Sequence, residues 1–183
     1  MKYLPNLITL SRIVSALFLL PIHDFSTAFF AVYTYCGVSD ILDGLLARKL
    51  KVTNESGARL DSIADIVFYA VTVYKIFPVL YSILTPSIWY IVLTALLIRI
   101  ISYAVAVIKY RRFASMHTYM NKLTGFLVFA VPYIVFKPFA MPICLIISVV
   151  AVLAAAEELF IHISAGEYNA DRKALFADVF YRQ

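Results

Sequence analysis

Residues 40–65 read DILDGLLARKLKVTNESGARLDSIAD. This stretch contains two pairs of aspartates, Asp40 with Asp43 and Asp61 with Asp65, spaced three and four positions apart. At such spacings both members of a pair lie on one face of an α-helix. Each pair also borders an apolar run, so the stretch predicts two helices with polar ends, joined by a short polar loop.

The composition places these helices in a membrane. Of the 183 residues, 63% are hydrophobic and 15% are charged, and the mean hydropathy is +0.87. An ordinary soluble domain has about 25% charged residues, and a fold of this size has too little interior to hide so much apolar surface from water. The composition therefore excludes a soluble globular enzyme, a disordered chain and a fibrous repeat.

The apolar runs predict an all-α membrane protein, a bundle of six transmembrane helices. The expected spans cover residues 4–22, 26–47, 57–79, 87–109, 119–136 and 140–163. With the amino terminus inside, 14 of the 16 Lys and Arg residues fall on the inner side, so both termini are expected in the cytoplasm. We find no repeat and no second domain, so residues 1–183 are expected to form one transmembrane domain in the inner cell membrane.

The basic balance does not call for a nucleic-acid partner. The net charge is +5, and an excess of Lys and Arg is usual at the cytoplasmic face of a membrane protein. The same placement brings the polar ends of the first three spans to one membrane face.

The four aspartates indicate a metal site. An ionised aspartate at membrane depth costs at least ~2.5 kcal/mol, and Arg48 and Arg59 cannot obviously neutralise four of them. Two hard divalent cations such as Mg²⁺ or Mn²⁺ can, and such a pair can clamp a phosphoryl group. The alternative is that the aspartates only join helices by pairing with Arg48, Arg59 or Arg99.

The residues between and beside the aspartates favour a phosphate-containing substrate. Gly44, Ala47 and Gly57 are small and leave room for a substrate to approach the backbone. Arg48 can hold a phosphate through two parallel hydrogen bonds.

Read together, these residues resemble the signature of the CDP-alcohol phosphotransferase family without departure. The pattern is Asp40-x-x-Asp43-Gly44-x-x-Ala47-Arg48, followed by Gly57-x-x-x-Asp61-x-x-x-Asp65. The chain length and the six expected spans also resemble the family. The resemblance implies transfer of the phosphatidyl group from CDP-diacylglycerol, or another CDP-linked lipid, to an acceptor hydroxyl, with release of CMP.

The resemblance also implies individual roles. Two divalent cations, Mg²⁺ or Mn²⁺, would be held by Asp40, Asp43, Asp61 and Asp65. Asp65 would also be the catalytic base that acts on the acceptor hydroxyl. The CDP pocket would be lined by Gly44, Ala47, Arg48, Gly57 and Asp61. By analogy with many relatives, a homodimer is expected.

Further polar residues are candidates for contact with the CDP-linked lipid donor or with the alcohol acceptor: Asn6, Thr9, Arg12, Arg99 and Lys122. The first three share a helix face and resemble the amino-terminal Asn-Leu-x-Thr-x-x-Arg stretch of bacterial members. Arg99 lies within an apolar span, so it should face the bundle interior. The alternative for Arg99 is a structural ion pair with Glu157 or Glu158.

The acceptor is expected to be a small polar alcohol. Glycerol 3-phosphate is the first choice, because the basic residues favour a phosphorylated acceptor and the short chain resembles bacterial phosphatidylglycerophosphate synthases. Serine, inositol phosphate and phosphatidylglycerol remain open. Two other classes would use the same carboxylates: a divalent-cation channel or carrier, and a di-metal lipid phosphohydrolase.

Overall fold

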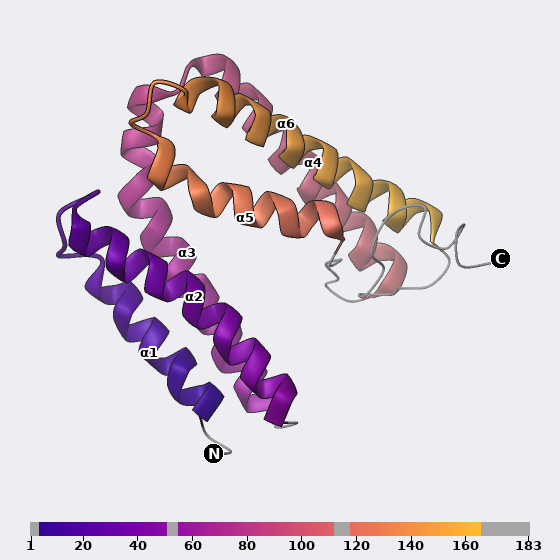
Figure 1. The fold of residues 1–183 in the computed structure, drawn as a ribbon. Coiled ribbons are helices and arrows are strands. Elements are labelled where there is room, and N and C mark those ends of the chain that lie inside the picture. The colour runs from indigo at the N-terminus through magenta and orange to yellow at the C-terminus, as the bar shows by residue number, and fades with distance from the viewer. Residues whose placement is uncertain (1–3, 51–54, 112–117, 166–183) are drawn as a thin grey trace. The chain divides into compact units, whose positions relative to one another are not determined.

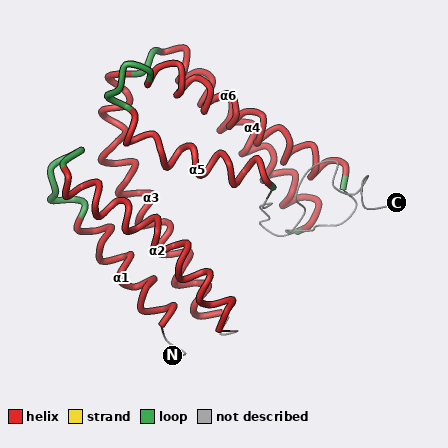
Figure 2. Tube along the Cα trace, viewed as in Figure 1, coloured by secondary structure: helices red, strands yellow, loops and turns green. Residues whose placement is uncertain are grey.

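A computed structural model describes residues 4–50, 55–111 and 118–165. Within these ranges the chain is helical and has no strand (Figures 1 and 2). The helices are α1 (Leu4–Phe18), α2 (Thr27–Leu50), α3 (Glu55–Ile83), α4 (Pro86–Tyr110), α5 (Tyr119–Ile134) and α6 (Ala140–Ser164). The prediction of an all-α protein is confirmed.

Four stretches of helix in the described part of the chain are long and apolar enough to cross a membrane. They are Thr27–Leu46, Arg59–Ile83, Pro86–Tyr110 and Ala140–Ser164. The other two helices are shorter: α1 has 15 residues and α5 has 16, where about 20 apolar residues span the hydrocarbon core without strain. Six spans and cytoplasmic termini therefore stay predictions.

The first helix ends at Phe18, four residues before the expected end of the first span. The amides of Leu19 and Leu20 bond to carbonyls three residues back, both at 3.1 Å, which tightens the final turn. Pro21 follows, and a proline disfavours the helical conformation of the residue before it, here Leu20. The third helix is longer than expected and continues through Pro78 to Ile83.

The chain divides into two compact units, Met1–Ile83 and Leu84–Gln183, and a single domain over residues 1–183 stays a prediction. In the first unit α1 packs against both α2 and α3. Ala16, Cys36 and Ala64, one from each helix, are fully buried, and small residues let membrane helices approach closely. The rings of Tyr33 and Phe68, with centroids 5.5 Å apart, join α2 to α3.

A lysine of α3 fastens the connection between α1 and α2. Lys75 Nζ donates to the carbonyls of Leu20 at 3.1 Å and Ile22 at 2.8 Å, and it pairs with Asp24 Oδ1 at 2.5 Å. Carbonyls beyond the end of a helix lack partners within the helix. The ammonium group of Lys75 supplies a hydrogen-bond partner for two such carbonyls and so holds the end of α1 against α3.

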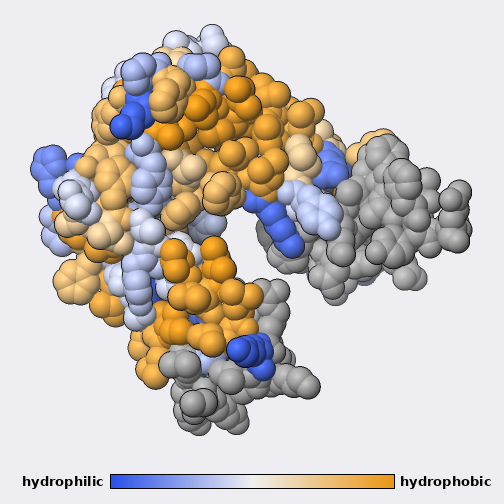
Figure 3. Space-filling model, viewed as in Figure 1, coloured by the Kyte–Doolittle hydropathy of each residue, from blue (hydrophilic) through white to orange (hydrophobic). Residues whose placement is uncertain are grey.

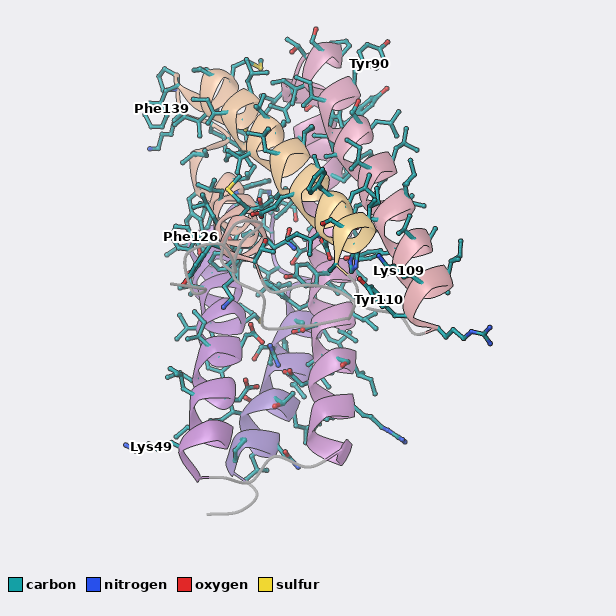
Figure 4. All side chains as sticks on the ribbon, turned by 90° about the vertical axis from the view of Figure 1, so that its right-hand side faces the viewer. Lys49, Tyr90, Lys109, Tyr110, Phe126 and Phe139 are labelled. Carbon is teal, nitrogen blue, oxygen red and sulfur yellow. The ribbon has the colours of Figure 1, made fainter. Side chains whose placement is uncertain are left out.

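In the second unit α6 packs against both α4 and α5. Three of the four buried residues of α4 are small, namely Ala95, Ser102 and Ala106, and the fourth is Ile88. At the end of α4, where Figure 4 labels Lys109 and Tyr110, Lys109 Nζ donates to the carbonyls of His162 at 3.0 Å and Ile163 at 2.8 Å. A cation at a helix carboxyl end is favourable, so Lys109 caps α6.

Large apolar side chains remain exposed along the helices of both units. Ile66 is 68% exposed, Ile108 80% and Phe126 70%, and Figure 3 shows apolar side chains over much of its visible face. Patches of this kind are rare on monomeric proteins in water. They suit helices that contact lipid, since a helix satisfies its own backbone hydrogen bonds.

Candidate active site

The site lies in the first unit, where α1, α2 and α3 each present polar side chains. Asp40 and Asp43 share a face of α2, and Asp61 and Asp65 share a face of α3. The structure brings both pairs together around the guanidinium of Arg12 on α1. The sequence predicted that the two acid pairs meet, but it did not predict that Arg12 lies among them.

Arg12 hydrogen-bonds to all four carboxylates. Its Nη1 donates to Asp40 Oδ1 and, at 3.1 Å, to Asp65 Oδ1. Its Nη2 donates to Asp61 Oδ1 and, at 3.1 Å, to Asp43 Oδ2. In the contacts that the described residues show, the one guanidinium of Arg12 faces four carboxylates, and such a group of carboxylates attracts further cations.

The cluster has a buried side and an open side. The side chains of Arg12 and Asp43 are 1% and 6% exposed. Those of Asp40, Asp61 and Asp65 are between 43% and 50% exposed. The guanidinium therefore lies on the buried side of the cluster, and the carboxylates of Asp40, Asp61 and Asp65 are accessible on the other side.

These carboxylates suit a divalent cation. Asp40, Asp61 and Asp65 each offer one oxygen, and the three oxygens lie within 4.8 Å of one another. Carboxylate oxygens are the preferred ligands of hard ions such as Mg²⁺ and Mn²⁺. The half-exposed position of all three side chains leaves an open approach for such an ion, so the residues present fit a metal.

Thr9 supports the most deeply buried aspartate. It is 4% exposed, and its hydroxyl lies 2.8 Å from Asp43 Oδ2 and 3.0 Å from the carbonyl of Pro5, one turn earlier. Thr9 and Arg12 therefore both hold Asp43 from α1. Asn6, the third residue of this predicted face, is half-buried in the same helix.

The residues expected to line a CDP pocket flank the acid cluster along α2 and α3. Gly44 follows Asp43 directly and is exposed, and Gly57 is half-buried in the first turn of α3. Ala47 and Arg48 continue α2, but their side chains lie outside the described residues.

Gly44 offers a sharp test because, among the described residues, a methyl group added there has no atom within 4 Å beyond its chain neighbours and its own helix backbone. We expect Gly44→Ala to fold with unchanged or slightly higher stability, by up to about 1 kcal/mol, because alanine favours the helix over glycine. If the nucleotide lies against this backbone, the methyl occupies its space, and activity falls about 10–200-fold. Thermal unfolding and turnover of the same preparation measure the two effects.

Gly125→Ala is the matched control, because Gly125 lies within α5 and also has open space where a Cβ would be. It should gain the same stability and keep its turnover. Equal activity in the two variants would contradict a nucleotide pocket at Gly44.

The second unit contains a separate polar cluster. Arg99 Nη1 donates to Glu158 Oε2 at 2.8 Å, and its Nη2 donates to Asn121 Oδ1 at 2.8 Å. Asn121 Nδ2 also donates to Glu158 Oε2 at 3.0 Å, and His162 Nε2 lies 3.7 Å from Glu158 Oε1. The predicted alternative of an ion pair between Arg99 and Glu158 is therefore present. Lys122 follows Asn121 and is exposed.

The roles of three residues in these two polar clusters, Arg12, Asn121 and His162, were not predicted from the sequence. Arg12 was a candidate substrate contact, whereas the structure pairs it with the four aspartates, for which Arg48, Arg59 and Arg99 had been the predicted partners. Asn121 and His162 were not singled out at all. The available signal was the position of Arg12 in an apolar helix, since a charge at that depth needs an opposite charge nearby.

Comparison with known proteins identifies the family. A family model described as CDP-alcohol phosphatidyltransferase matches residues 2–157, and the chain belongs to this family. A curated relative, the cardiolipin synthase (CMP-forming) / mitochondrial hydrolase fusion protein of Schizosaccharomyces pombe, is 41% identical over 64 residues. The match covers 34% of this chain and 11% of that protein, so the chain spans only a small part of its relative. No solved structure matches the chain.

Proposed function

We propose that this protein is a metal-dependent CDP-alcohol phosphatidyltransferase of phospholipid biosynthesis. It transfers the phosphatidyl group of CDP-diacylglycerol to the hydroxyl of a small polar alcohol and releases CMP. The observation that carries the proposal is the gathering of Asp40, Asp43, Asp61 and Asp65, from two helices, in a chain of this family.

The four aspartates would hold two divalent cations, Mg²⁺ or Mn²⁺. When bound, such ions neutralise the diphosphate and stabilise the departing CMP. Asp65 would accept the proton of the acceptor hydroxyl, whose oxygen bonds to the phosphorus nearest the diacylglycerol as the bond to CMP breaks. A base must reach that proton within about 3 Å, and the half-exposed side chain of Asp65 is open to an incoming alcohol.

Other residues would bind the donor. Gly44, Ala47, Arg48, Gly57 and Asp61 would form the CDP pocket along α2 and the start of α3. Asn6, Thr9 and Arg12 would contact the donor or the acceptor from α1. The bonds from Thr9 and Arg12 to Asp43 support at least a role in placing the metal ligands.

Glycerol 3-phosphate is the proposed acceptor, which would make the protein similar to bacterial phosphatidylglycerophosphate synthases. Arg99 and Lys122 would contribute to its recognition as cationic residues of the second unit. The match to a CMP-forming cardiolipin synthase favours phosphatidylglycerol as the second candidate. Serine and inositol phosphate are the other candidate acceptors.

The protein would lie in the inner cell membrane as a single domain with six spans. Both termini and the active site would face the cytoplasm, and two copies would form a homodimer. The apolar helices and the concentration of basic residues on one side of the expected topology support this arrangement.

An assay with purified protein in detergent tests the proposal. Labelled CDP-diacylglycerol is supplied with Mg²⁺ or Mn²⁺ and each acceptor in turn, and release of CMP is measured. Acceptor-dependent release is expected, most strongly with glycerol 3-phosphate. Release of a lipid phosphate by water alone would indicate a phosphohydrolase, and ion flux in vesicles without CMP release would indicate a transporter.

A further inference from the structure

We propose that Arg12 competes with the divalent cations for the four aspartates and so sets the metal affinity of the site. The inference rests on the proposed function, because it concerns the ions which that reaction requires. Arg12 would then have a role beyond substrate contact. Its guanidinium is the counter-ion of the metal-free site, and a metal that binds there must displace it from the carboxylates or share their oxygens with it.

The first argument is the bonding of the guanidinium. Within the described residues, every hydrogen bond of its two Nη atoms goes to one of the four carboxylates. The buried Nε makes no hydrogen bond in that part of the chain. Arg12 is therefore held by the atoms that a metal would need, and no separate anchor for the guanidinium is present among the described residues.

The second argument is burial. The Arg12 side chain is 1% exposed, so its charge is poorly screened by water and acts strongly on groups a few ångströms away. It donates to the same carboxyl groups, those of Asp40, Asp61 and Asp65, whose oxygens lie within 4.8 Å of one another. A cation entering among these oxygens meets both the attraction of the acids and the repulsion of a fixed positive charge.

The consequence is a balance between two states of the cluster. Without Arg12, four carboxylates would repel one another at short range, and the metal-free fold would be weakened. With Arg12, the metal-free fold is stabilised, and the gain on binding a metal is reduced by the same interaction. When Arg12 is removed, the stability of the metal-free protein should therefore fall and its affinity for the metal should rise. A ligand that binds only the folded state stabilises that state by mass action, so the variant should also gain more stability from the metal.

The test uses the full-length protein in detergent and Mn²⁺ as the probe. Binding is read from the electron paramagnetic resonance signal of free Mn²⁺, and thermal unfolding is recorded with and without the ion. Arg12→Gln is expected to bind Mn²⁺ on the order of tenfold or more tightly than the wild type. It should also unfold at a lower temperature without metal and gain more from Mn²⁺ than the wild type does.

Three variants serve as controls. Arg12→Lys keeps the charge and should bind Mn²⁺ much more like the wild type than Arg12→Gln does. Thr9→Val removes a hydrogen bond to Asp43 without changing any charge, so it should not tighten binding. Lys49→Gln removes one positive charge from an exposed side chain at the end of α2, which points away from the helices in Figure 4, and it should leave the affinity near that of the wild type.

The outcomes separate this inference from the proposed function. Folded Arg12→Gln with an equal or weaker Mn²⁺ affinity overturns the competition. If Arg12→Gln unfolds without metal, Mn²⁺ should restore its fold, and failure to do so also overturns the inference. If the wild type binds no Mn²⁺, or Asp61→Asn binds it as tightly, the metal-dependent function itself fails.

Discussion

Asp65→Asn is expected to abolish measurable turnover while leaving the protein folded. Asparagine has almost the shape of aspartate but cannot take a proton from the acceptor hydroxyl. Loss of a positioned general base typically costs about 10²–10⁴-fold in rate. The fold should persist because the oxygen of the substituted amide can still accept the hydrogen bond that Asp65 Oδ1 receives from Arg12 Nη1 at 3.1 Å. Acceptor-dependent CMP release and thermal unfolding measure the two effects.

The two roles proposed for Asp65 can be told apart by a comparison with Asp61→Asn. Asp61 is proposed to bind metal and nucleotide but not to act as the base, and its side chain is similarly exposed, 48% against 43%. Both variants should weaken Mn²⁺ binding. At saturating Mn²⁺, Asp61→Asn should recover much of its turnover and Asp65→Asn should not. Recovery in both variants would remove the assignment of Asp65 as the base.

Asp24→Asn is the matched control for these substitutions. It removes one carboxylate from the same unit, in the connection between α1 and α2, where Asp24 pairs with Lys75. Its side chain is 41% exposed, so the change should cost no more than about 1 kcal/mol of stability. Its CMP release should match that of the wild type, which would show that the losses at Asp61 and Asp65 are local to the acid cluster.

The sequence predicted those parts of the fold and site that follow from helical spacing. The i,i+3 and i,i+4 aspartates had to share helix faces, and a hairpin of two membrane helices had to bring them together. The start of α4 was also predictable, because Pro86 provides a fixed backbone angle suited to a first helical turn and lacks an N–H that would need a partner.

The partners of charged residues were harder to predict, because pairing between helices depends on packing and not on spacing along the chain. Arg12 reaches residues 28 to 53 positions away, and nothing in its own helix specifies them. The end of α1 shows the same limit. The hydropathy of residues 19–22 continued the span, whereas Pro21 and the contacts from Lys75 ended the helix earlier.

The second large effect that we expect concerns the stability that the polar cluster of the second unit provides. Arg99→Met is expected to destabilise the protein by about 3–5 kcal/mol, because it leaves a buried carboxylate without its cation. Glu158 is fully buried, whereas the Arg99 side chain is 27% exposed. Glu158 also accepts a hydrogen bond from Asn121 and lies 3.7 Å from His162, and neutral contacts of this kind replace a lost guanidinium only in part. A loss of this size lowers Tm on the order of 10 °C.

The double variant Arg99→Met/Glu158→Met distinguishes a coupled pair from two independent residues. Replacing a buried ion pair with apolar side chains of similar size is often neutral or stabilising, so the double variant should unfold at a higher temperature than Arg99→Met alone. Additive losses would mean that the two side chains do not stabilise one another. CMP release from the double variant then addresses the second role proposed for Arg99: if the guanidinium also recognises the acceptor, turnover stays low although the stability has returned.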